Sequence, residues 1–184
     1  DLVLPVTFRS RINVKQTIVN KNRDMLFVGS DFPPNIEALD FLFNKVMPFT
    51  DRKLIVVGKG MDKYRNIYKR DNIDILGFVD DVSEYYSTCN IVLTPIFSGA
   101  GMKVKVADAL NSGKIIIGTS FSFIGYDTSL AGDGFLIPAE TASDYLEKLA
   151  LDYASYSYLA KEFFEKKLSS ACIENKIDLF FKNR

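Results

Sequence analysis

Residues 91–114 read IVLTPIFSGAGMKVKVADALNSGK, an apolar run followed by a glycine turn and an amphipathic segment. Ile91–Thr94 are apolar or β-branched, which is typical of a buried strand. A helix is predicted over Met102–Asn111, ending at Gly113, because glycine tolerates the left-handed conformation that follows a helix end. A strand that passes through a short turn into a helix is the building unit of a parallel α/β sheet.

The same alternation of short apolar runs and longer amphipathic segments continues on both sides of this stretch. Helices are predicted after Pro33-Pro34, over residues 61–70, and from Asp81, where Glu84 three residues on resembles a capping box. We therefore expect an α/β fold: a Rossmann-like parallel sheet of about six strands with helices on both faces. The predicted strands are Leu26–Gly29, Leu54–Gly58, Ile73–Leu76, Ile91–Thr94, Ile115–Gly118 and Phe135–Ile137.

The pattern divides the chain into three segments. Residues 1–24 are interpreted as a lead-in from a missing N-terminal domain, because the sequence begins with Asp1 in a loop-like stretch. Residues 25–140 form the predicted Rossmann-like domain. Residues 141–184 contain only helical patterns, and these helices are expected to pack on the same domain. The predicted C-terminal helices are Tyr145–Leu151, Tyr158–Leu168 and Ile173–Phe181.

Composition excludes several function classes. The 23 basic and 23 acidic side chains cancel, so no global charge favours nucleic acid as a partner. Histidine is absent, which excludes a Ser-His-Asp or Cys-His nucleophile and a histidine metal site within this chain. Cys89 and Cys172 lie far apart and fit reduced thiols of a cytosolic protein. With no apolar run of about 20 residues, the chain is expected to be soluble.

The glycine turn carries the sharpest chemical signal. Glycines let a ligand approach the backbone, and the free N–H groups at a helix start favour negative charge such as a diphosphate. With a helix starting near Gly101, Asp108 would lie about 10 Å along its axis and could accept hydrogen bonds from ribose hydroxyls. The candidate site residues here are Ser98, Gly99, Ala100, Gly101, Met102, Lys103, Lys105 and Asp108.

A plainer interpretation remains open, in which the turn only connects two elements and Lys105 and Asp108 form a surface pair. The position of the turn favours the ligand site, because ligands of open α/β sheets bind outside the carboxyl ends of the strands. Ser30 and Lys59 also follow strands and could line the same crevice, although each could equally be a solvated loop side chain. Gly77-Phe78 could offer backbone groups or a ring to a base, or Phe78 could belong to the core.

Five short segments in order resemble the C-terminal, donor-binding domain of retaining GT-B glycosyltransferases of family four, also called group 1. Within this family, the members that build bacterial surface polysaccharides such as capsule are the most similar to this sequence. The resemblance covers Met25–Leu151. Its segments are Leu26–Ser30 with Pro33–Asn35, Leu54–Gly58, Gly77–Asp81, Pro95–Gly101, and Lys105–Leu110 with Gly113 and Lys114.

The resemblance implies one half of a GT-B enzyme, inactive alone, that binds a UDP- or GDP-sugar and needs no cofactor or metal. The turn Gly99–Lys103 would hold the diphosphate with help from Lys105, Asp108 the ribose, and Gly77-Phe78 the base. The acceptor, a carbohydrate or a lipid-linked one, would be held by the N-terminal domain. The resemblance also implies a cytoplasmic location, either free or peripherally associated with the inner face of the plasma membrane.

The sequence departs from the family pattern at three places. Asp108 replaces a glutamate, Ser98 or Phe97 stands where an acidic residue often begins the turn, and Ser30 and Asp31 stand where an arginine is expected. These departures keep a second hypothesis open, a non-catalytic nucleotide-binding or assembly module derived from a glycosyltransferase. A dehydrogenase is disfavoured, because no G-x-G-x-x-G follows the first strand. No residue of the chain is singled out as catalytic.

Overall fold

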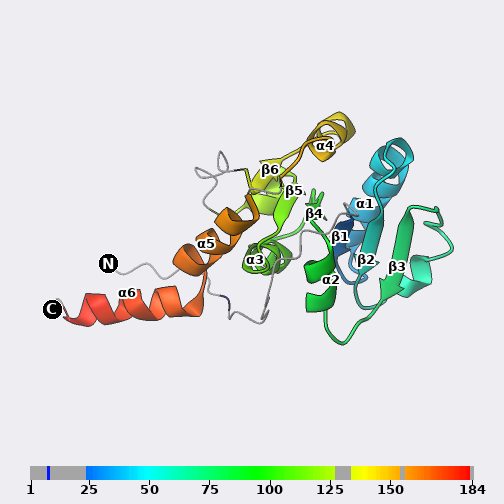
Figure 1. Ribbon diagram of the computed structural model, residues 1–184. Coiled ribbons are helices and arrows are strands. Elements are labelled where there is room, and N and C mark those ends of the chain that lie inside the picture. The colour runs from blue at the N-terminus through cyan, green and yellow to red at the C-terminus, as the bar shows by residue number, and fades with distance from the viewer. Residues whose placement is uncertain (1–7, 9–23, 127–133, 154–155, 183–184) are drawn as a thin grey trace.

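The computed structural model describes Phe8 and residues 24–126, 134–153 and 156–182 (Figure 1). Six strands form one sheet in the order β3-β2-β1-β4-β5-β6, and every neighbouring pair is parallel. The predicted α/β, Rossmann-like fold is confirmed, and each strand lies within one residue of its predicted bounds. The strands are β1 (Met25–Val28), β2 (Leu54–Val57), β3 (Ile73–Gly77), β4 (Ile91–Thr94), β5 (Ile115–Gly118) and β6 (Leu136–Pro138).

The strand order places a switch point in the middle of the sheet. The chain builds outward from β1 to β2 and β3, then returns to place β4 on the other side of β1 and builds outward again. Connections therefore run in opposite directions from β1 and β4. In open parallel sheets the carboxyl ends of two such strands border a crevice where ligands bind.

Helices cover both faces of the sheet. On one face, α1 (Pro33–Phe41) packs against α4 (Ala142–Leu149). The rings of Phe41 and Tyr145 meet edge to face there, with centroids 5.4 Å apart. On the other face, α5 (Ser157–Lys167) packs against α3 (Val104–Asn111), and Lys161 Nζ donates to Asn111 Oδ1 at 2.6 Å. Figure 1 shows α1 and α4 on one side and α2 (Ser83–Thr88), α3 and α5 on the other. The last helix, α6 (Ser170–Lys182), projects away from the sheet (Figure 1).

Burial on both faces explains why the strands read as continuous apolar runs. All four residues of β4 and of β5 are buried, including Thr94 at the end of β4. A sheet covered by helices on both sides has no solvated face, so polar alternation is absent. No helix in the described ranges combines the length and apolar character needed to cross a bilayer.

The prediction of a helix over residues 61–70 is wrong. Only the 3-10 helix η3 (Met61–Tyr64) forms, after a left-handed Gly60, and Arg70 pairs with Ile73 in an isolated bridge. The Arg65 side chain explains the difference, because its Nε donates to the carbonyl of Ile75 at 2.9 Å. This bond ties the segment to the edge strand β3 instead of leaving it to continue as a helix.

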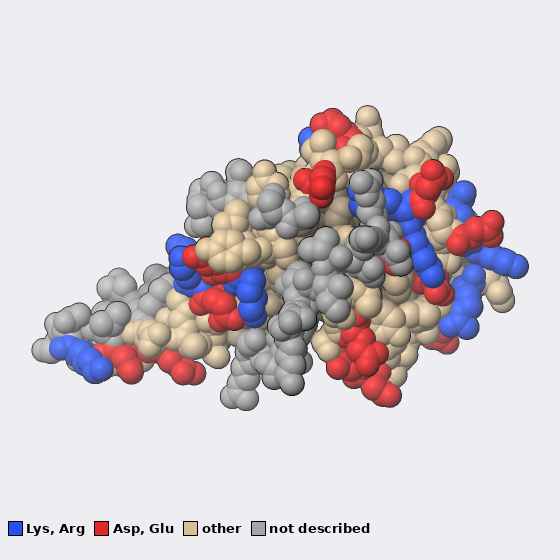
Figure 2. All heavy atoms as spheres, viewed as in Figure 1, with Lys and Arg blue, Asp and Glu red and all other residues tan. Residues whose placement is uncertain are grey.

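The predicted capping box at the third helix is also wrong. Helix α2 begins at Ser83, and Asp81 Oδ1 accepts from the Ser83 N–H at 2.8 Å. A carboxylate nevertheless occupies the start of this helix, and the red atoms of Asp and Glu gather below α2 in Figure 2.

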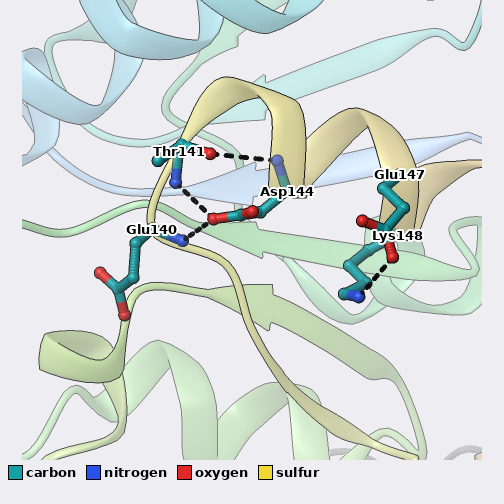
Figure 3. Close-up of polar contacts among 5 residues, drawn as sticks. All are labelled: Glu140, Thr141, Asp144, Glu147 and Lys148. Carbon is teal, nitrogen blue, oxygen red and sulfur yellow. Dashed lines mark hydrogen bonds and ion pairs between the residues drawn. The ribbon is translucent and has the colours of Figure 1, made fainter.

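Helix α4 has the complete reciprocal cap that α2 lacks (Figure 3). Thr141 Oγ1 accepts from the Asp144 N–H at 3.2 Å, and Asp144 Oδ2 accepts from the N–H groups of Thr141 at 2.8 Å and Glu140 at 3.0 Å. Those bonds to its charged form hold the pKa of Asp144 below its usual value. The carboxylate therefore stabilises the helix start near neutral pH, and that contribution is lost on acidification through its folded pKa.

Replacing Thr141 by alanine should lower the free energy of unfolding by about 1 kcal/mol, because the Asp144 N–H loses its side-chain acceptor. Urea denaturation at pH 7 measures this change. The matched control is Thr141→Ser, which keeps the hydroxyl and should stay within about 0.5 kcal/mol of the parent chain. Equal losses in both variants would contradict the assigned cap.

Candidate functional site

The glycine turn follows β4 at the switch point of the sheet. Gly99 and Gly101 have φ values of 107° and 68°, in the left-handed region that favours glycine. Residues 98–101 are exposed. Helix α3 begins at Val104, with Lys103 in an extended conformation before it, so the expected helix start near Gly101 is wrong. Two left-handed residues cannot join a right-handed helix, and the turn is correspondingly longer.

The later helix start changes the position of Asp108. It lies four residues beyond Val104, about 6 Å along the axis instead of the expected 10 Å. Asp108 is half-buried, and its negative charge adds to the burial that raises the pKa values of Tyr86 and Tyr126. The carboxylate thus lies one turn into the helix, closer to the helix start than the sequence indicated.

The helix starts along the carboxyl edge differ in charge. Carboxylates lie at the starts of α2 and α4, where Asp81 accepts from the Ser83 N–H and Asp144 accepts from the Thr141 N–H. In α1 and α3, which flank the switch point, no side chain caps the helix start and no acidic residue lies in the first turn. Pro33 and Pro34 leave α1 without N–H groups at its first two positions, whereas the first turn of α3 contains no proline. Free N–H groups and the helix dipole favour an anion at a start such as that of α3. The start of α3, beside the switch point, is therefore open to negative charge.

Lys105 points from α3 toward α1. Its Nζ donates to Asn35 Oδ1 at 2.6 Å and lies 4.7 Å from the centroid of the Phe27 ring. Burial, with a smaller contribution from the positive charge of Lys103, lowers the pKa of Lys105 to about 7. A lysine whose charged form is poorly solvated gains most when an anion arrives beside it.

Lys103 folds back over the turn. Its Nζ donates to the Gly101 carbonyl at 2.7 Å and lies 4.6 Å from the centroid of the Phe121 ring. Its own carbonyl accepts from the Tyr126 hydroxyl at 2.8 Å, and burial lowers the pKa of its ammonium. The loop after β5 thus fixes the residue that precedes α3.

Buried hydroxyl groups anchor that loop to the end of β4. The Ser122 hydroxyl donates to the Thr94 carbonyl, and the Ile96 N–H donates to Ser122 Oγ at 3.3 Å. Thr119 Oγ1 donates to the Ile96 carbonyl from the other side. Because these groups are buried, each bond costs free energy to break. The loop that holds Lys103 therefore has a rigid base.

Contacts from α1 bring several predicted residues together. Ser98 Oγ donates to Glu37 Oε2 at 2.9 Å, and Asn35 Nδ2 donates to the Ser30 carbonyl at 2.8 Å. Lys105 reaches the same Asn35 side chain, so contacts with Asn35 and Glu37 of α1 join Ser30, Ser98 and Lys105, and this set of residues is called the crevice wall. The contacts add three residues to the candidate site that the sequence motifs do not predict as site residues: Asn35, Glu37 and Tyr126. Only Asn35 carried a signal, as the residue after Pro33-Pro34 in the resembling motif.

The other predicted residues lie around or away from this wall. Met102 packs partly buried beside Gly125, and Ala100 is exposed on the turn. Lys59 and Phe78, which is 67% exposed, follow β2 and β3 on the same edge, further from the turn. Gly77 has a left-handed φ of 83° and its carbonyl accepts from the Gly58 N–H at 2.8 Å.

A six-stranded parallel sheet in this order, with a glycine turn at its switch point, defines the Rossmann-like α/β class to which each half of a GT-B enzyme belongs. The family model of the group 1 glycosyl transferases matches residues 22–151. The chain belongs to that family, and the resemblance stated from its sequence is confirmed.

Individual relatives agree with this assignment. A Klebsiella pneumoniae protein described as an uncharacterized 44.6 kDa protein in the cps region is 26% identical, over 82% of this chain and 45% of the relative. The chain therefore spans less than half the length of that curated relative. WaaG, a glycosyltransferase involved in lipopolysaccharide biosynthesis, superposes with a TM-score of 0.67 at 17% identity, over 95% of this chain and 54% of WaaG.

A third similar protein is the pneumococcal O-GlcNAc transferase GtfA, whose structure contains UDP and GlcNAc. It superposes with a TM-score of 0.64 at 16% identity, over 96% of this chain and 38% of GtfA. At sequence identities of 17% and 16%, the similarity to WaaG and GtfA shows a shared fold.

Proposed function

We propose that this chain is the donor-binding domain of a glycosyltransferase that transfers a sugar, with retention at the anomeric carbon, from a nucleoside diphosphate to a polysaccharide or lipid-linked acceptor. The observation that carries this proposal is the exposed glycine turn before α3, which has two lysines beside it and no acid in the first helical turn. A diphosphate matches that combination of free amides and positive charge.

Each site residue then has a role. The amides of Gly99–Lys103 and the ammonium groups of Lys103 and Lys105 bind the diphosphate, and Asp108 accepts from the ribose. Gly77-Phe78 borders the base, while Ser30 and Lys59 line the edge between them. The UDP bound to the similar GtfA and the cps region of the Klebsiella relative support a nucleotide-sugar donor and a polysaccharide product.

The chemistry of these residues is electrostatic. As the bond from the anomeric carbon to the diphosphate breaks, negative charge grows on the leaving group, and fixed N–H groups and lysines stabilise it. This role requires no metal ion or organic cofactor. An N-terminal domain that holds the acceptor would close over the donor and exclude water, which protects the donor from hydrolysis.

A non-catalytic nucleotide-binding module is the second candidate, and one observation favours it. Asp31, at the position where the family carries an arginine, forms an ion pair with Lys63 and accepts from the Tyr64 hydroxyl at 2.7 Å. A carboxylate there adds no positive charge for a diphosphate. Tight nucleotide binding without sugar transfer or donor hydrolysis, in a longer protein that includes the N-terminal domain, would decide for this candidate.

Calorimetric titration with UDP, GDP, ADP and CMP, without added metal, tests the proposed donor site. We expect selective binding of UDP or GDP, weakened about tenfold by Lys103→Ala and by Asp108→Ala, since each removes one charge-assisted hydrogen bond. Lys148→Ala is the matched control, because Lys148 pairs with Glu147 on α4 (Figure 3) and should leave binding unchanged. Failure of a folded chain to bind any nucleotide would contradict the proposal.

A further inference from the structure

The Asn35 side chain connects three parts of the crevice wall. Its Nδ2 donates to the Ser30 carbonyl at 2.8 Å, and its Oδ1 accepts from Lys105 Nζ at 2.6 Å. It also lies directly over Gly29, where an added Cβ would come within 2.7 Å of Asn35 Cγ. Asn35 therefore joins the loop after β1, through the first turn of α1, to the ammonium on α3.

The orientation of this amide is fixed by its two partners. A carbonyl oxygen can only accept, so the NH2 group of Asn35 must face Ser30 and its oxygen must face Lys105. An amide oxygen orients an ammonium but carries no net charge. In contrast to a carboxylate, it leaves the positive charge of Lys105 available to an incoming anion.

The charges around Lys105 reinforce this difference. On α3 itself, the charge that acts on it is the like charge of Lys103. On α1, Glu37 accepts from Ser98, and in the loop after β1 Asp31 pairs with Lys63. Strand β1 contributes the face of the Phe27 ring. Among the described residues no carboxylate lies within 4.0 Å of Lys105 Nζ, which agrees with the pKa of about 7 that burial gives it.

We propose that Asn35 is a positioning residue that holds Lys105 between α3 and α1 without neutralising it, so that a nucleotide sugar binds beside it together with a proton. Above neutral pH the free site holds the neutral amine. The arriving diphosphate favours the ammonium, and the proton comes from solvent to the lone pair of Lys105 Nζ. This inference rests on the proposed donor site, and it adds proton linkage to that site.

The test is calorimetric titration with UDP-glucose and with GDP-mannose at pH 8, in Tris and in HEPES buffer. The diphosphate of an intact nucleotide sugar does not titrate near this pH, so a buffer-dependent enthalpy counts protons taken up by the protein. For a group whose pKa is about 7, we expect uptake of about 0.9 proton at pH 8. Uptake near zero with normal binding would overturn the inference and leave the donor site standing.

Three variants distinguish a role of Asn35 in positioning Lys105 from a role in supporting the fold alone. Asn35→Asp should bind about tenfold more weakly with uptake near zero, since its carboxylate keeps Lys105 protonated and neutralises it. Lys105→Arg should bind without uptake, because a guanidinium stays charged. The control is Asn44→Asp, which adds the same charge at an exposed position whose Nδ2 bonds the Asp40 carbonyl, and it should retain the uptake of the parent chain. Equal uptake in Asn35→Asp and the parent chain would refute the role of Asn35.

A measurement without nucleotide keeps the inference testable if the donor site itself fails. Lysines methylated with a carbon-13 label can be titrated by NMR, and the signal absent from Lys105→Arg belongs to Lys105. We expect its midpoint near pH 7 in the parent chain and at least 2 pH units higher in Asn35→Asp. Binding of neither nucleotide sugar would contradict the proposed function, whereas a parent midpoint above pH 9 would contradict this inference.

Discussion

Replacing Lys105 by methionine should stabilise the chain at pH 7 and weaken nucleotide binding about 100-fold. The two effects have one cause, because the ammonium is kept in a half-buried place where its charged form is poorly solvated. Methionine fills a similar volume without that charge. The loss of binding corresponds to one or two charge-assisted hydrogen bonds to the diphosphate, about 2–3 kcal/mol.

The pH dependence of stability distinguishes this explanation from simple repacking. The folded pKa of Lys105, about 7, lies below the ordinary lysine value of 10.5, so between these values the unfolded chain binds more protons. The stability of the parent chain should therefore rise with pH across this window, by up to about 1.4 kcal/mol per pH unit from this one group. Lys105→Met should lack that contribution, so its advantage should shrink between pH 7 and pH 10. A constant difference between the two stability curves would refute the buried charge.

The sheet was predictable from sequence because each strand has its own local signal. Buried parallel strands read as apolar runs, and glycines such as Gly29 and Gly58 mark their carboxyl ends. The segment 61–70 was not predictable, because its conformation depends on the Arg65 guanidinium reaching a carbonyl of β3. No periodicity in the segment itself carries that information.

The candidate site divides in the same way. The glycine turn and its lysines were found from local spacing, but their partners on α1 were not. Asn35 lies 70 residues before Lys105 and Glu37 lies 61 residues before Ser98, and only the return of the chain to place β4 beside β1 brings these pairs together. The start of α3 is not predictable, because the sequence does not show that Gly99 and Gly101 both adopt positive φ.

Gly58→Ala should be the most destabilising alanine substitution at the glycines of this edge. A Cβ at residue 58 would lie 1.9 Å from the Gly29 carbonyl oxygen, a backbone atom at the end of the neighbouring strand. Neither atom can move alone, because the Gly29 N–H is bonded to the Val57 carbonyl at 2.9 Å and the Gly58 N–H to Gly77 at 2.8 Å. We expect a loss of about 3 kcal/mol or more in the free energy of unfolding, the upper range for overpacking.

Gly101→Ala is the matched comparison, because it tests backbone strain without overpacking. No atom lies within 4 Å of a Cβ placed there, but its φ of 68° costs a side-chain residue about 1 kcal/mol. Urea denaturation should therefore give Gly58→Ala a much lower free energy of unfolding than Gly101→Ala. Nucleotide titration of the folded variants should give the opposite order, with the weaker binding in Gly101→Ala, because only that substitution alters the turn itself. Equal stability losses would mean that the ends of β1 and β2 can separate, and the crevice wall built on them would then lack the rigidity that a fixed set of amides requires.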